Sequence, residues 1–110
     1  MDITQKTAIE LVLEERHRQT SVEGFTTEHD DEHTKGELAN AAACYAMTQW
    51  TGDNPANDGR SILHNVWPKS WSLHWWKPSP ENRIRELTKA GALILAEIER
   101  LQRLEDNVRT

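Results

Sequence analysis

The sequence of 110 residues lacks the features that define several classes of protein. Its single cysteine, Cys44, excludes a disulfide scaffold and an all-cysteine zinc site, and it fits a reducing cytoplasm. No run of 18 apolar residues is present, so we expect no membrane span. The first residues lack the basic start and small-residue cleavage site of a secretion signal, so we expect a cytoplasmic protein.

Apolar residues are scarce, at 36% of the chain, and five residues are tryptophans. One domain is the size this length allows, and its core must draw heavily on the large indole side chains. A homo-oligomer would bury additional apolar surface, so we expect the chain to associate with copies of itself.

Charge is unevenly distributed around a net value of −5. Residues 1–59 hold 12 acidic and 4 basic side chains, whereas residues 60–103 hold 4 acidic and 8 basic ones. The negative total disfavours broad nucleic-acid binding, which needs a positive face. An acidic patch facing a basic one suits a metal ion with a small phosphorylated ligand, and it is also typical of an ordinary charged surface.

Helical spacing of apolar residues predicts three helices, over residues 3–19, 34–50 and 80–105. Asp2 or Thr4 could cap the first, and Thr34 with Glu37 has the form of a capping box at the second. The second helix is rich in alanine, which lets neighbouring helices approach closely. No segment alternates like a strand, so we expect one all-α domain, a small helical bundle completed by oligomerisation.

The third helix has the clearest signals. Ser79 is placed to cap it, Pro80 to occupy its first position and Glu81 to complement its dipole. Gly91 interrupts an apolar stripe at helical spacing and predicts close contact with another helix. The stripe comprises Ile84, Leu87, Gly91, Ile94, Ile98 and Leu101.

A long connection, residues 52–78, joins the second and third helices, with room for a short helix over residues 61–66. It ends in WPKSWSLHWWKP (67–78), which holds four of the five tryptophans. Indoles stack on nucleobases while lysines contact phosphates, so Trp71, Trp75, Trp76 and Lys77 are candidate nucleotide-binding residues. The same tryptophans could instead form the core or an interface between copies. Arg83, Arg85 and Lys89 are candidate phosphate contacts, or solvated charges.

The densest polar cluster is EHDDEH (28–33), followed by Glu37. If the second helix begins early, His29, His33 and Glu37 share one face, a spacing that can bind a transition metal. The alternative is structural, because acidic residues stabilise a helix N-terminus and Glu37 closes a capping box.

Glutamates four residues apart, Glu10 and Glu14, share a face of the first helix, with Glu15 beside them. Arg18 lies four residues after Glu14 and could balance its charge. Alternatively, Glu14 or Glu15 could pair with Glu37 across a helix interface and hold a divalent cation. Nucleophilic catalysis has little support, because Cys44 lies in an apolar stretch and no Gly-rich phosphate loop is present.

Four segments together resemble a recurring family of small phage and prophage accessory proteins. They are ERHRQ (15–19), VEGFTTEHDDEH with GELANAAACYA (22–46), WPKSWSLHWWKP (67–78) and KAGALILAEIERL (89–101). More distantly, the helix with Glu14 and Glu15 followed by GEL is similar to the MazG-like all-α nucleotide pyrophosphohydrolases.

The MazG-like resemblance implies a magnesium-dependent enzyme that cleaves nucleoside triphosphates and works as a dimer or tetramer. Glu14 and Glu15 match the first two glutamates of the family's E-E-x-x-E helix, and Glu37 matches the first residue of its E-x-x-D helix. Arg18 stands at the third glutamate and Asn40 at the aspartate. The implied metal ligands are therefore Glu14, Glu15 and Glu37.

Three functional hypotheses follow. In the first, Glu14, Glu15 and Glu37 hold Mg²⁺ or Mn²⁺, and Asp31 or His33 orients or deprotonates the attacking water. In the second, the protein binds a nucleotide without turnover and sequesters a signalling nucleotide of the host's immune defence. In the third, the acidic window 23–37, with six acidic residues and one basic residue, inhibits a host protein.

Overall fold

The computed structural model describes residues 5–47, 66–79 and 81–109. Within these ranges every regular element is a helix, which confirms the all-α class. The helices are α1 (Ala8–Ser21), α2 (Thr27–Asp31), α3 (Glu37–Ala46), the 3-10 turn η2 (Leu73–Trp75) and α5 (Arg83–Arg109). The predicted short helix at 61–66 and the caps Asp2 and Thr4 lie outside the described residues, apart from Val66.

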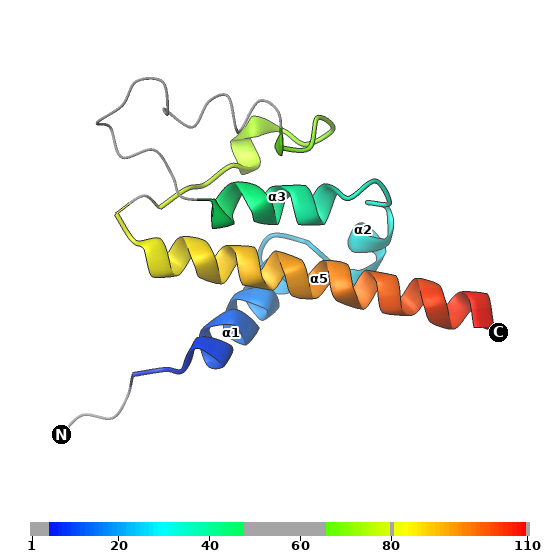
Figure 1. Cartoon of the computed structure of the whole chain (residues 1–110), viewed down its shortest axis with the longest axis horizontal. Coiled ribbons are helices and arrows are strands. Elements are labelled where there is room, and N and C mark those ends of the chain that lie inside the picture. Colours follow the sequence, from blue (N-terminus) through cyan, green and yellow to red (C-terminus); the bar gives the residue numbers. More distant parts are fainter. Residues whose placement is uncertain (1–4, 48–65, 80, 110) are drawn as a thin grey trace.

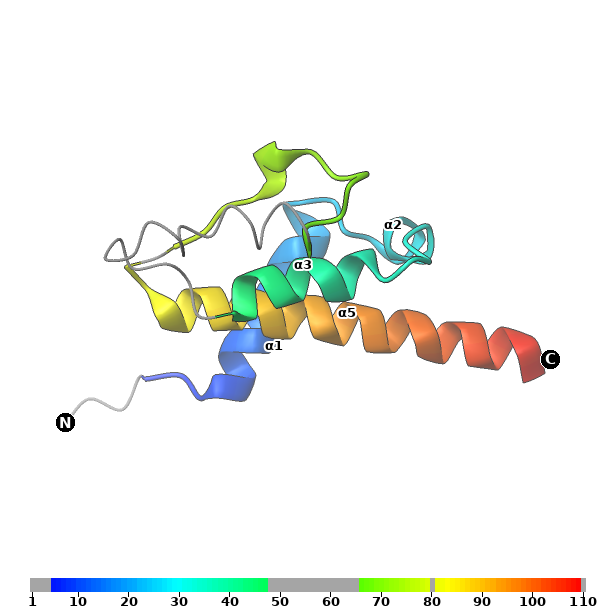
Figure 2. The same ribbon diagram turned by 45° about the horizontal axis from the view of Figure 1, so that its top comes forward.

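Helix α5 is the axis on which the other elements pack. Helix α3 lies along its first half, α1 crosses it at a steep angle, and α2 sits against its second half (Figure 1). The segment 66–79 covers α3 on the side away from α5, as the turned view shows (Figure 2). The last turns of α5 extend beyond the other elements (Figure 1).

The helix ends are set by residues that the sequence patterns did not indicate. Thr7 and Glu10 form the capping box of α1. The expected box at Thr34 is wrong, because α3 begins at Glu37 after Gly36, whose φ of 82° places it in the left-handed region. The prediction that Ser79 caps the last helix is also wrong, because α5 begins four residues later, at Arg83.

Small residues bring α3 and α5 close together, and indoles close the core above them. Ala41, Ala42 and Leu38 of α3 are buried with Ala90, Leu93 and Ala96 of α5. Trp67 and Trp71, 5% and 6% exposed, belong to this cluster. For these two tryptophans the core interpretation is confirmed. Cys44 is buried as expected, and burial raises the pKa of its thiol to about 11.

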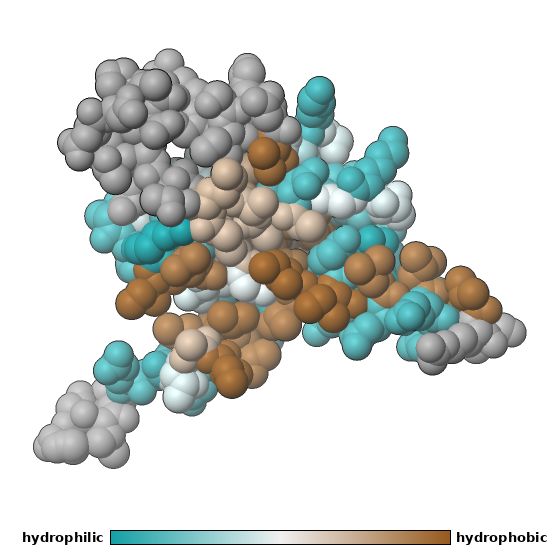
Figure 3. Space-filling model, viewed as in Figure 1, coloured by the Kyte–Doolittle hydropathy of each residue, from teal (hydrophilic) through white to brown (hydrophobic). Residues whose placement is uncertain are grey.

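The apolar stripe of α5 does not face this core. Ile84, Ile94 and Ile98 are 66%, 46% and 47% exposed, and a band of hydrophobic surface runs along α5 and α1 (Figure 3). Gly91 of the same stripe meets another helix closely, as predicted, because a Cβ built there would lie 3.1 Å from Val12 Cγ2 of α1. No helix among the described residues is long and apolar enough to cross a membrane.

Candidate functional site: an aromatic and basic cavity

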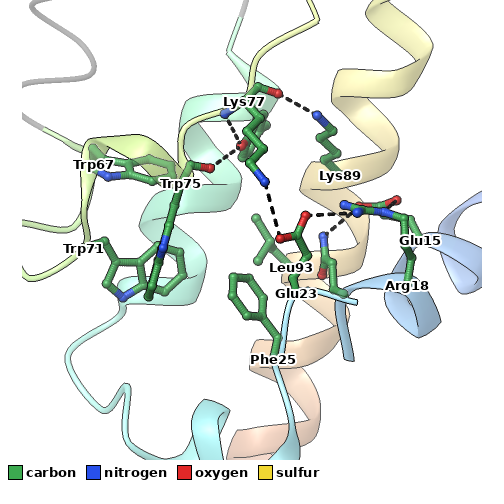
Figure 4. A pocket seen from close by; sticks show the side chains of 12 residues that line it. Glu15, Arg18, Glu23, Phe25, Trp67, Trp71, Trp75, Lys77, Lys89 and Leu93 are labelled. Carbon is green, nitrogen blue, oxygen red and sulfur yellow. Dashed lines mark hydrogen bonds and ion pairs between the residues drawn. The ribbon is translucent and has the colours of Figure 1, made fainter. Parts of the chain in front are cut away.

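A cavity of about 100 Å³ lies where α1, α3, α5 and the tryptophan segment meet (Figure 4). It is partly open to solvent. An engineered cavity of about 150 Å³ holds benzene, so this volume is on the scale of one aromatic ring. The aromatic part of its lining consists of Phe25, Tyr45, Trp67, Trp71 and Trp75. The polar and charged part consists of Glu15, Arg18, Gln19, Glu23, Lys77 and Lys89.

Three rings form one wall. The ring centres of Trp71 and Trp75 are 5.3 Å apart, and Phe25 lies 5.8 Å from the first and 6.0 Å from the second. Trp75 is 42% exposed, so part of this wall is accessible from solvent. Such tilted packing holds the rings at fixed positions and leaves indole surface on which a planar ligand can stack.

Tyr45 fixes the tryptophan segment over the cavity. Its hydroxyl donates to the Trp75 carbonyl at 3.3 Å and accepts from the Lys77 backbone amide at 3.0 Å. Burial raises the pKa of Tyr45 to about 12. The hydroxyl therefore stays neutral at physiological pH and serves as a structural hydrogen-bonding group.

Lys89 brings a cation into the cavity from α5. Its Nζ donates to the Lys77 carbonyl at 2.6 Å and lies 5.5 Å from the centre of the Tyr45 ring. The residue is only 9% exposed, and no carboxylate of the described residues is within ion-pair distance of its amine. Burial and the neighbouring Arg85 lower the pKa of Lys89. An anionic ligand would relieve both effects, because it supplies the missing counter-charge.

Glu15, by contrast, is fully engaged. It is 3% exposed, and its carboxylate accepts hydrogen bonds from Arg18 at 2.8 and 2.9 Å and from Arg85 at 2.6 Å. Gln19 adds a weaker one at 3.3 Å. Burial acts to raise the pKa of Glu15, but the bonds from Arg18 and Arg85 outweigh it and hold the pKa below its usual range. The predicted partnership of Arg18 with Glu14 is therefore wrong.

A second carboxylate, Glu23, links the two sides of the cavity mouth. It pairs with Arg18 at 2.9 Å and with Lys77 at 3.5 Å. Among the residues that line the cavity, the cations Arg18, Lys77 and Lys89 thus outnumber the carboxylates Glu15 and Glu23. The local balance is positive although the whole chain is negative.

The proposed metal ligands do not converge in the described structure. Glu14 is exposed and pairs with Lys6 at 2.7 Å. Glu15 is held by the two arginines, and Glu37 accepts from the Lys35 backbone amide at 2.7 Å. Across the described ranges no group of three or more His, Cys, Asp or Glu side chains could hold a metal ion. These donors do not fit a magnesium centre.

Neither of the two predicted catalytic residues lines the cavity, although His33 contacts the lining residue Trp71. Asp31 is exposed and pairs with Arg103 at 2.8 Å. His33 lies beside His29, with their Nε2 atoms 3.2 Å apart, and its Nδ1 is 4.0 Å from Glu37. The early helix start that would place His29, His33 and Glu37 on one helical face does not occur, because α2 ends at Asp31 and α3 begins at Glu37.

The predicted nucleotide-binding residues divide into two groups. Trp71, Trp75, Lys77 and Lys89 all line the cavity. The other three do not line it and instead support residues around it. Arg85 bonds Glu15, and Trp76 packs on Tyr45 with ring centres 4.6 Å apart. Arg83 donates to the carbonyls of Tyr45 and Ala46 and so caps the end of α3.

Several residues that line the cavity were not predicted as site residues from the sequence, notably Gln19, Phe25 and Tyr45. The chain has one phenylalanine and one tyrosine, and this scarcity was the available signal, because single aromatic residues in a tryptophan-rich chain are candidates for a shared cluster. A comparison of the chain with protein-family models, curated proteins and solved structures found no match.

Proposed function

We propose that this protein binds a small anionic molecule with an aromatic ring, a nucleotide or a nucleotide derivative, in the cavity between α1, α3, α5 and the tryptophan segment. The observation that carries the proposal is Lys89, a buried cation without a carboxylate partner among the described residues, at an aromatic cavity. Burying such a charge is costly unless it is paired. A phosphate would pair with it while the attached ring stacks on Trp71 or Trp75.

Binding without turnover is the form of this function that the geometry supports best. The MazG-like hypothesis needs carboxylates free to hold Mg²⁺, and Glu15 already accepts hydrogen bonds from Arg18, Arg85 and Gln19. In the cavity, positive charge exceeds negative charge, which favours retention of an anion. A protein of this kind, encoded by a phage and acting in the host cytoplasm, would sequester a signalling nucleotide.

The third hypothesis, an acidic surface that inhibits a host protein, has less support. Asp30 is fully buried against Arg16, and Asp31 pairs with Arg103. Glu23 also points its charge at Arg18 and Lys77. Half of the six acidic residues in the window 23–37 are thus balanced within the chain, which leaves less free negative charge for binding a host protein.

The test is a nucleotide panel, including cyclic dinucleotides, incubated with the purified chain and Mg²⁺ or Mn²⁺. The filtrate is chromatographed before and after heat denaturation of the protein. A nucleotide that leaves the filtrate and returns intact on denaturation supports the proposal. Conversion to monophosphate and pyrophosphate would instead establish the hydrolase, and an unchanged filtrate for every nucleotide would contradict nucleotide binding.

Two lysine variants make the test specific to the cavity. Lys89→Met keeps an unbranched side chain one atom shorter and removes its charge, so we expect retention of the nucleotide to weaken at least tenfold. Lys69→Met changes an exposed lysine of the same tryptophan segment that does not line the cavity, and it should retain nucleotide like the parent. Equal losses in both variants would place the binding site elsewhere.

A further inference from the structure

Two histidines behind the aromatic wall connect it to a buried ion pair. The Trp71 indole donates from Nε1 to His33 Nδ1 at 3.4 Å, and His33 Nε2 lies 3.2 Å from His29 Nε2. His29 Nδ1 is 3.4 Å from Asp30 Oδ1. Asp30 has no exposed side-chain surface, and its other oxygen accepts from Arg16 at 3.0 Å. These contacts form one continuous chain from the indole to the carboxylate.

The chemistry of the end groups gives this chain a single direction. An indole nitrogen can only donate, so His33 Nδ1 must accept and the His33 proton lies on Nε2. His33 Nε2 then donates to His29 Nε2, which places the His29 proton on Nδ1, facing the Asp30 carboxylate. An ionised carboxylate only accepts, so each donor meets an acceptor. Both imidazoles are neutral in this arrangement, in line with burial lowering the pKa of His33.

The chain touches the cavity wall at two places. Trp71 lines the cavity directly. His29 stacks on Phe25, another lining residue, with ring centres 4.6 Å apart and planes within 6° of parallel. The hydrogen bond to His33 also satisfies the Trp71 indole, whereas the buried Nε1 of Trp67 has no hydrogen-bond partner among the described residues.

We propose that Asp30, His29 and His33 are positioning residues that hold the stacking face of Trp71 in place through this one-directional chain of hydrogen bonds. The inference rests on the proposed function of the cavity, because its consequence is ligand affinity. The charged groups near the two imidazoles are Asp30, with Arg16 beyond it, Glu32, and Glu37 at 4.0 Å from His33. The Arg16–Asp30 ion pair is the fixed end of this chain of hydrogen bonds. Because Arg16 belongs to α1, the hydrogen bonds tie the aromatic wall to that helix.

The proton positions are tested first, without any ligand. In two-bond nitrogen–proton NMR spectra of the full chain with ¹⁵N-labelled histidine at pH 8, we expect His29 as the Nδ1–H tautomer and His33 as the Nε2–H tautomer. Assignment uses His29→Gln and His33→Gln. A His29 proton on Nε2 would contradict the proposed direction of the hydrogen bonds, because the N–H groups of His29 and His33 would then face each other.

Reversing the fixed end tests the direction. In Asp30→Asn the amide oxygen should turn to Arg16, which leaves the NH₂ group facing His29 and requires the opposite tautomer there. We expect the His29 proton to move to Nε2 and the Trp71 indole N–H resonance to shift. Asp31→Asn makes the same chemical change at the next residue, which takes no part in these hydrogen bonds, and it should move neither signal. Unchanged tautomers in Asp30→Asn would overturn the proposal.

Ligand affinity is tested at the other end, with AMP as the probe in calorimetric titrations. His33→Phe removes the acceptor of the Trp71 indole without disturbing the buried carboxylate, so it also serves if Asp30→Asn does not fold. We expect AMP to bind about tenfold more weakly. His33→Gln, whose carbonyl can accept from Trp71, should recover part of the loss. His74→Phe alters an exposed histidine of the tryptophan segment that takes no part in these hydrogen bonds. This variant should bind AMP like the parent.

The outcomes separate this inference from the proposed function. If the parent binds AMP and His33→Phe binds it equally well, the positioning role is overturned and the cavity remains a nucleotide site. If the parent binds neither AMP nor any nucleotide of the panel, the proposed function fails and the positioning role, which is defined by its effect on affinity, fails with it. The expected tautomers would then describe a structural network only.

Discussion

Gly91 of α5 lies directly against Val12 of α1, and a Cβ at position 91 would come within 3.1 Å of the valine Cγ2. The glycine sets how closely the two helices cross. Because α1 carries Glu15, Arg18 and Gln19 into the cavity lining, this crossing also positions the polar side of the candidate site.

The first prediction concerns this contact. Alanine is favoured over glycine inside a helix by about 1 kcal/mol, but Gly91→Ala must also displace Val12. In a Val12→Ala background that obstacle is absent, so there Gly91→Ala should raise the free energy of unfolding by about 1 kcal/mol. In the parent the gain should be smaller or reversed. Urea denaturation of the four chains measures the coupling, and strict additivity would show that the two helices do not press on each other.

A second prediction separates two adjacent glutamates. Glu15→Gln leaves Arg18 and Arg85 without a buried carboxylate, so we expect a loss of about 3 kcal/mol in the free energy of unfolding. Glu14→Gln removes an exposed pair with Lys6, 55% and 51% exposed at the side chains, and should cost less than about 0.5 kcal/mol. Urea titration decides between them. Equal costs would mean that Glu15 is not held as the structure places it.

Stability should also fall in two steps as the solution is acidified. The pKa of His33 is lowered by burial and by His29, so below the usual histidine range the unfolded chain binds a proton that the folded chain resists. Stability should therefore decline as the pH falls below about 6.5. Glu15 and Glu23 have lowered pKa values, so their contribution is present above about pH 4.5 and is lost as the pH falls further through their folded values.

The His33 step can be isolated by mutation. Denaturation midpoints of the parent and His33→Gln, measured between pH 8 and pH 5, should converge as the pH falls if the histidine supplies the first step. Parallel curves for the two chains would assign the loss to other groups.

The exposed face of α5 gives a prediction about association. Ile94, Ile98 and Leu101 are 46%, 47% and 44% exposed on one side of the helix, and such a face favours contact with another apolar surface. The expected homo-oligomer remains a prediction, which light scattering after gel filtration tests. Ile98→Lys should lower the mass to that of a single chain, while Asp106→Lys, away from the stripe, should not. A parent protein with the mass of a single chain would contradict the predicted homo-oligomer.

The sequence was sufficient for the helical class and for the contact at Gly91, because both follow from local spacing and composition. It was insufficient for the orientation of α5. The stripe from Ile84 to Leu101 has the spacing of a core face, yet the residues that α5 buries in the core with α3 are Ala90, Leu93 and Ala96. Helical periodicity identifies a face and does not tell which partner covers it.

The candidate site shows the same limit. Trp71, Trp75, Lys77 and Lys89 could be proposed from residue type alone, since indoles and lysines are what a nucleotide needs. Phe25 and Tyr45 join them only through contacts between distant segments. The predicted role of Arg18 beside Glu14 failed because Glu15, on the adjacent buried side of α1, accepts the same guanidinium at 2.8 Å.

The most direct test of the central claim is retention of nucleotides by the parent, Lys89→Met and Lys69→Met, read by chromatography before and after heat denaturation. We predict that at least one nucleotide is retained by the parent and by Lys69→Met, returns intact on denaturation, and is retained at least tenfold more weakly by Lys89→Met. Retention by all three chains alike, or by none of them, would contradict the account.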